Sequence, residues 1–148
     1  MRLRVACMLA VIAAAGCGDR PPLATACRDG GEAAVRSALH GAPGHVALAD
    51  GTALSTCVER AYSDADLQVV GAALTAAGDG LARAAARDPH AALELGFLDG
   101  AATRGAGRTN GIASELANRL DHLVDGGSLS PAARAAYARG RAAGLASG

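Results

Sequence analysis

The chain has 148 residues, enough for about one domain, and its 14 Arg balance 14 acidic residues, so its formal charge is zero. Hydrophobic residues make up 51% of the sequence, but 39 of its residues are alanine, and only three are aromatic. The neutral charge excludes a basic nucleic-acid-binding protein, so we expect no nucleic-acid partner. No apolar run reaches the ~18 residues that a membrane-spanning helix requires.

The first residues have the layout of an export signal. Arg2 and Arg4 form a short positive start, and residues 5–15 form an uncharged apolar stretch. At ~1.5 Å per residue this stretch would cover about half of a bilayer core, which is typical of a signal peptide and too short for a membrane span. It leads into the sequence Ala14-Ala15-Gly16-Cys17.

The sequence Ala-Ala-Gly-Cys ending at Cys17 resembles the lipobox, the cleavage motif of bacterial lipoproteins, with Ala14 where Leu is usual. The resemblance implies diacylglycerol on Cys17 and cleavage between Gly16 and Cys17. It also implies a protein anchored by lipid at the extracytoplasmic face of the cell membrane. An ordinary secretory signal and a cytoplasmic protein with an apolar start remain alternatives.

Cleavage at this point would divide the chain into a leader over 1–16, a tether over 17–26 and a helical domain over 27–148. Pro21-Pro22 lies in the tether and would stiffen it. The cleaved chain would carry a charge of −2, because the leader takes Arg2 and Arg4 with it.

Cys27 and Cys57 are the cysteines that would remain after Cys17. Because an extracytoplasmic compartment is oxidising, we expect them to form a disulfide. Free thiols and a redox pair are the alternatives, although the chain has no CxxC motif. No His stands at metal-site spacing beside either cysteine, so we expect no metal site there.

The remaining pattern predicts an all-α fold, a small antiparallel bundle of about four main helices. In chain order we expect helices over 32–39, 57–62, 65–87, about 89–104, from 109 or 110 to about 125, and 131 to about 145. Thr56 with Glu59 predicts a capping box for the second of these. Between the first two, Val46 and Leu48 alternate with alanine before an Asp-Gly turn signal, which predicts a short β-hairpin over 46–54.

Two of these helices carry further signals. The helix over about 89–104 has large apolar residues over a wide arc, so we expect it to be the most buried element. Gly96 and Gly100 are four residues apart within it, and we interpret this spacing as close packing against another helix. Asp88-Pro89 and Ser130-Pro131 have the N-cap and first-turn residues that begin a helix.

Few residues have side chains suited to catalysis or ligand binding, and they are scattered along the chain. His90 and Glu94 share a helix face and could form half of a metal site, although a solvated pair is the simpler interpretation. Asp121, His122 and Asp125 are interpreted in the same way, as a solvated helix end. The glycine-rich segment 105–111 is similar to a phosphate loop, but it lacks the Lys-Ser/Thr of a Walker motif, so we interpret it as a plain connecting loop. Arg134, Arg139 and Arg141 could face anionic lipid or a cell-wall polymer.

No nucleophile motif or cofactor motif stands out, so we expect no enzyme, no cofactor and no metal. Segments 92–101 and 110–116 resemble those of small Ala-rich lipoproteins of high-GC bacteria, and this resemblance implies no particular activity. The sequence favours a lipid-anchored cell-envelope protein with a non-catalytic binding or structural domain. Its partner would be an envelope protein or polymer. The alternative is a small-ligand or metal-binding envelope module.

Overall fold

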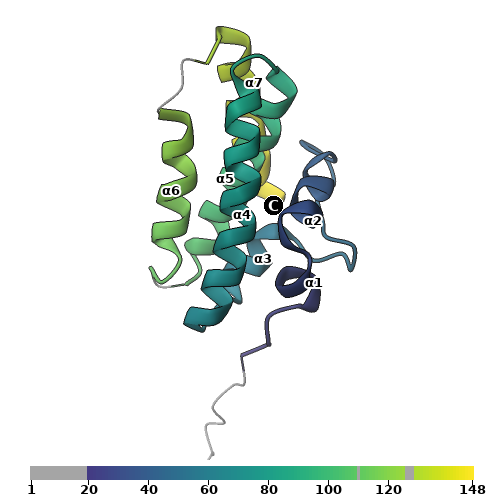
Figure 1. Cartoon of the computed structure of the whole chain (residues 1–148), viewed down its shortest axis with the longest axis vertical. Helices are drawn as coiled ribbons and strands as arrows, with labels where there is room; N and C mark the ends of the chain where they lie inside the picture. Colours follow the sequence, from purple (N-terminus) through teal and green to yellow (C-terminus); the bar gives the residue numbers. More distant parts are fainter. Residues whose placement is uncertain (1–19, 110, 126–128) are drawn as a thin grey trace, which may run out of the picture.

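A computed structural model describes residues 20–109, 111–125 and 129–148. The described chain contains seven helices and no strand, so the predicted all-α class is confirmed (Figure 1). The helices are α1 (Thr25–Asp29), α2 (Gly31–Leu39), α3 (Leu54–Glu59), α4 (Asp64–Ala85), α5 (Pro89–Ala106), α6 (Ser114–Asp125) and α7 (Pro131–Ser147). Within these ranges, no helix combines the length and the apolar character needed to cross a membrane.

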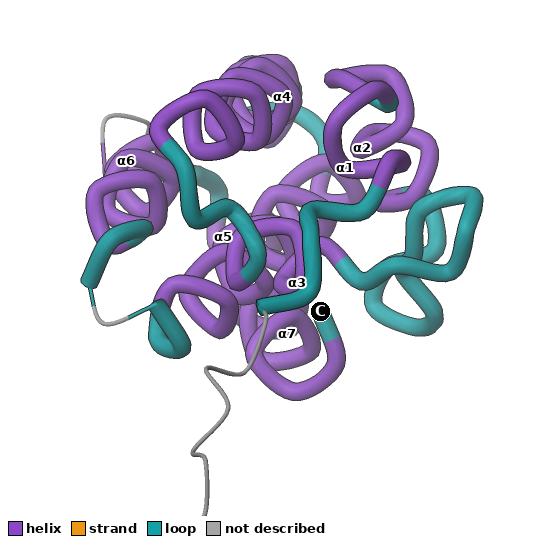
Figure 2. Tube along the Cα trace, turned by 90° about the horizontal axis from the view of Figure 1, so that it is seen from below, coloured by secondary structure: helices purple, strands orange, loops and turns teal. Residues whose placement is uncertain are grey.

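Helix α5 forms the centre of the molecule. Seen from below, it is surrounded by α3, α4, α6 and α7 (Figure 2), and it contacts each of them. Its large apolar residues Leu95, Phe97 and Leu98 are at most 1% exposed. The prediction that this helix is the most buried element is therefore confirmed.

Helices α5 and α7 form the most extensive contact between helices, and glycines on both of them make it possible. Gly96 and Gly100 lie against the backbone of α7, and Gly140 and Gly144 lie against the backbone of α5. A Cβ at Gly140 would overlap the carbonyl oxygen of Leu93. The predicted close packing at Gly96 and Gly100 is confirmed. Residue numbers rise together along the contact, so these two helices run in the same direction.

Three of the long helices begin at capping residues that the sequence indicates. The side chains of Ser63, Asp88 and Ser130 each accept a hydrogen bond from a backbone N–H in the first turn of α4, α5 and α7. Proline follows at the start of α5 and of α7, where its missing N–H has no helical partner to lose. The predicted starts at Asp88-Pro89 and Ser130-Pro131 are confirmed, and α4 begins one residue before its predicted range of 65–87.

The predicted β-hairpin over 46–54 is wrong. Residues 46–53 form a loop that tightens at Asp50-Gly51, where Leu48 N–H donates to Thr52 O at 2.9 Å and Gly51 has a φ of 83°. Val46 and Leu48 are each 5% exposed, so their apolar side chains are buried against helices. A short hairpin is marginal without further strands, and here burial against helices replaces pairing between strands.

Two helix boundaries also differ from the prediction. Helix α3 spans Leu54–Glu59, starts three residues early and has no side-chain cap, so the capping box at Thr56 is wrong. Burial of Leu54 at 1% exposure favours the earlier start. Helix α6 begins at Ser114 because Thr109 instead caps a preceding turn, accepting from Ala113 N–H at 3.1 Å. The last residue of α6, Asp125, agrees with the predicted end at about 125.

Candidate functional site

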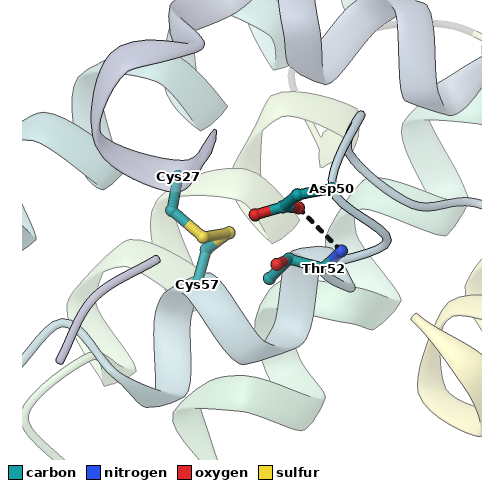
Figure 3. Close-up of a disulfide and its surroundings, with 4 residues drawn as sticks. All are labelled: Cys27, Asp50, Thr52 and Cys57. Carbon is teal, nitrogen blue, oxygen red and sulfur yellow. Dashed lines mark hydrogen bonds between the residues drawn. A yellow bond between two sulfur atoms is a disulfide. The ribbon is translucent and has the colours of Figure 1, made fainter. Parts of the chain in front are cut away.

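The predicted disulfide between Cys27 and Cys57 is confirmed. The two sulfur atoms lie 1.98 Å apart and the two Cα atoms 5.5 Å apart, joining α1 to α3 (Figure 3). Both cysteines are buried, at 6% and 3% exposure. Beside them, Asp50 accepts a hydrogen bond from Thr52 N–H at 2.9 Å, and bonding to Thr52 lowers the pKa of the Asp50 carboxyl. The disulfide thus connects α1, the first described helix, to α3, which packs on α5.

Cys17, the predicted lipidation site, lies outside the described residues. The described chain begins at Arg20, whose guanidinium carbon lies 5.0 Å from the ring centroid of Tyr62. Leu23 is already buried and α1 begins at Thr25, so the last residues of the predicted tether belong to the packed domain. The described packed domain therefore extends to within a few residues of Cys17.

The structure brings a second histidine to the predicted His90–Glu94 pair. Glu94 has a side chain only 5% exposed, and its Oε1 lies 2.8 Å from His40 Nδ1 and 3.3 Å from His90 Nδ1. His40 follows α2, 54 residues earlier in the chain, so sequence spacing gave no signal for it. Two exposed imidazoles therefore share one carboxylate oxygen. In the described part of the chain, no group of three or more His, Cys, Asp or Glu side chains is arranged to hold a metal ion.

A second buried carboxylate lies between α5 and α7. Asp99 is fully buried, and its Oδ2 accepts hydrogen bonds from Tyr137 Oη at 2.7 Å and from Arg141 Nε at 2.6 Å. Thr103 Oγ1 lies 3.5 Å from the other oxygen. Tyr137 and Arg141 are one turn apart on α7, a spacing that could have indicated a shared partner. Arg141 is among the basic residues predicted to face outward, whereas Asp99 and Tyr137 are not among the predicted candidates.

In this cluster, Tyr137 and Arg141 both hold their protons more tightly than they would in water. Burial and the hydrogen bond to Asp99 raise the pKa of the Tyr137 phenol well above its ordinary 10.0. The hydrogen bond to Asp99 also raises the pKa of the Arg141 guanidinium. Acid–base catalysis near neutral pH needs a group that exchanges its proton there. Tyr137 and Arg141 are therefore suited to clamping α7 onto α5, and their protons stay in place.

A groove of about 560 Å³ lies between α4 and α6. Its lining includes the partly buried residues Leu67, Gly71, Thr75 and Leu116, together with polar side chains of both helices. The groove is open because the small side chains on this face of α4 do not extend as far as α6. Thr75 Oγ1 is buried and has no hydrogen-bond partner among the described residues. The groove is one place where the described surface could accept another molecule.

The other predicted candidates are not brought together. Gly105 lies inside α5 against Ser55 and Val58 of α3, so the phosphate-loop interpretation is wrong for this part of the segment. Asn110 lies outside the described residues, as does the side chain of Asp125. Arg134 and Arg139 are exposed, whereas Arg141 is bound to Asp99.

Comparison with protein families, with curated proteins and with solved structures gave no match to this chain.

Proposed function

We propose that this chain is a lipid-anchored cell-envelope protein at the extracytoplasmic face of the cell membrane. The observation that carries the proposal is the lipobox-like sequence ending at Cys17, three residues before the first described residue, Arg20. The disulfide between Cys27 and Cys57 supports it, because disulfides persist in oxidising compartments outside the cytoplasm. Two acyl chains on one cysteine would hold the domain stably at a bilayer.

Detergent phase partitioning tests the anchor. We expect the wild-type chain, expressed with its leader, to enter the detergent phase and Cys17→Ser to stay in the aqueous phase. Cys7→Ser is the matched control, because Cys7 belongs to the leader and would be removed by cleavage. Equal partitioning of wild type and Cys17→Ser would contradict the proposal.

The helical domain is proposed to bind an envelope protein or polymer without catalysing a reaction. The groove between α4 and α6 offers a binding surface, and the buried Asp99 cluster has the character of a structural clamp. Co-purification from native membranes tests this role. A partner retained by wild type and lost from Ala72→Arg, an exposed change in the groove lining, would support it. A partner that binds both equally would show that the groove is not the binding surface.

The second candidate is a small-ligand or metal-binding envelope module. The observation that bears on it is the approach of His40 to His90 and Glu94, which adds a third polar group to the pair. These side chains are not arranged to hold a metal ion as they stand, so metal binding there would require them to rearrange. Thermal melts with and without zinc distinguish the candidates. A zinc-dependent rise in Tm that His90→Ala abolishes would favour the module, and unchanged melts would favour the binding or structural domain.

A further inference from the structure

One end of the molecule carries two exposed, large apolar side chains. Helices α4 and α6 lie side by side and run in the same direction, since Gly71 faces Leu116 and Gly78 faces Leu120 and Leu123. Both helices therefore begin at the same end, the lower end in Figure 1, which we call the tether end. Tyr62 and Ile112 each stand two residues before one of these helix starts.

Tyr62 is 36% exposed and Ile112 is 54% exposed, the latter being the most exposed of the large apolar residues in the described chain. Single apolar residues on a surface are common and need no explanation by themselves. These two differ because they lie at the end from which the chain leads to Cys17. Their position at this end therefore determines which surroundings the two side chains can contact.

The path of the chain supports this placement. Residues 20–24 lie at the tether end (Figure 1). The guanidinium of Arg20 packs over the Tyr62 ring, with its carbon 5.0 Å from the ring centroid. Arg20 is three positions after Cys17 in the sequence, and a fully extended chain spans at most about 11 Å between them. A lipid on Cys17 would therefore hold the Arg20 backbone within about 11 Å of the lipid headgroups, and Tyr62 packs against the Arg20 side chain.

We infer that the tether end is a membrane-contact surface that places Tyr62 and Ile112 in the headgroup region of the bilayer, an inference that rests on the proposed lipid anchor at Cys17. Tyrosine is enriched at this depth because its ring is apolar and its hydroxyl is polar. Arg20 has an apolar stem and a charged end, a combination that suits the same boundary. The domain then stands on the membrane with α4 and α6 rising from it and their groove facing sideways.

The absence of Trp from the chain allows a direct test. The full chain is purified with its lipid and reconstituted into phosphatidylcholine vesicles that contain brominated acyl chains, which quench nearby Trp fluorescence. Ile112→Trp is the principal variant, and Tyr62→Trp is a second variant in case the first does not fold. Arg87→Trp is the control, because Arg87 is exposed beyond the opposite end of α4, about 33 Å away.

We expect quenching of Ile112→Trp and Tyr62→Trp to exceed quenching of Arg87→Trp severalfold. Equal quenching at both ends, in protein that floats with the vesicles, would overturn the membrane-contact surface and leave the anchor standing. Failure of the wild-type chain to float, or equal flotation of Cys17→Ser, would overturn the anchor and the inference with it. The two failures are therefore distinguishable.

Discussion

The two buried carboxylates of α5 depend on side chains from other parts of the chain. Glu94 is bonded to His40 at the end of α2, and Asp99 is bonded to Tyr137 and Arg141 of α7. A buried charge without partners is strongly unfavourable, so each pair specifies how a neighbouring segment lies against the central helix. At the scale of single residues, these hydrogen bonds fix the orientation of neighbouring helices in a core that is mostly alanine and leucine.

Tyr137→Phe should change how stability depends on alkaline pH. The pKa of Tyr137 in the folded chain is raised above the ordinary 10.0. Above about pH 10 the unfolded chain releases this proton and the folded chain keeps it, so the free energy of unfolding falls by up to ~1.4 kcal/mol per pH unit. Denaturant unfolding between about pH 9 and 11 measures the slope. We expect a shallower decline in Tyr137→Phe, and identical slopes would contradict the assignment.

Substitution of the histidines around Glu94 should be non-additive. His40→Ala or His90→Ala leaves the carboxylate one partner, so each should lower the free energy of unfolding by less than about 1 kcal/mol. The double variant leaves a buried carboxylate without either imidazole and should lose about 1–3 kcal/mol. In a Glu94→Leu background the same double change should have little effect. Additive losses in the wild-type background would count against the shared carboxylate.

At the scale of elements, the space around a glycine shows whether two helices are in close contact or leave a gap between them. At Gly140 a Cβ would overlap the backbone of α5, whereas at Gly71 it would lie 3.9 Å from Leu116. Gly140→Ala should therefore destabilise the fold by about 1–3 kcal/mol, the usual cost of overpacking. Gly71→Ala should stabilise it by about 0.4–1 kcal/mol by restricting the unfolded chain. Equilibrium unfolding measures both, and a stabilising Gly140→Ala would contradict the close contact.

The helices that sequence predicts well are those with caps at a fixed spacing. Ser63, Asp88-Pro89 and Ser130-Pro131 mark the starts of α4, α5 and α7 locally, without reference to the rest of the fold. The structure of the segment around Val46 and Leu48 cannot be predicted from local signals of this kind. Its alternation arises from burial against helices, and alternation alone cannot distinguish that from a strand.

The same limit applies to the candidate sites. The disulfide follows from the number of cysteines and from the oxidising compartment that the lipobox-like sequence implies, so Cys27 and Cys57 are predictable. The approach of His40 to Glu94 depends on how α2 lies on the core, and nothing in the local sequence encodes it. The groove depends on the distance between α4 and α6, which only packing determines.

At the scale of the whole molecule, the disulfide joins the part of the chain nearest Cys17 to the core. Helix α1 is only five residues long, and the disulfide ties it to α3, which packs on α5 at Gly105. A pull on the proposed anchor would therefore pass through α1 and the disulfide to the central helix. Without the disulfide, the short N-terminal helices would rely on burial of a few side chains such as Leu23 and Val35.

Removing the disulfide should therefore destabilise the domain and loosen its N-terminal part first. The closed loop spans a sequence separation of 30, for which loop-closure entropy gives about 3–4 kcal/mol. We expect the Cys27→Ser, Cys57→Ser double variant to lose about that much free energy of unfolding in denaturant titrations. Hydrogen exchange should rise most in α1 and α2, because they lose their link to α3. Reductant should lower wild-type stability to that of the double variant and leave the variant unchanged, whereas equal stability before reduction would contradict this role.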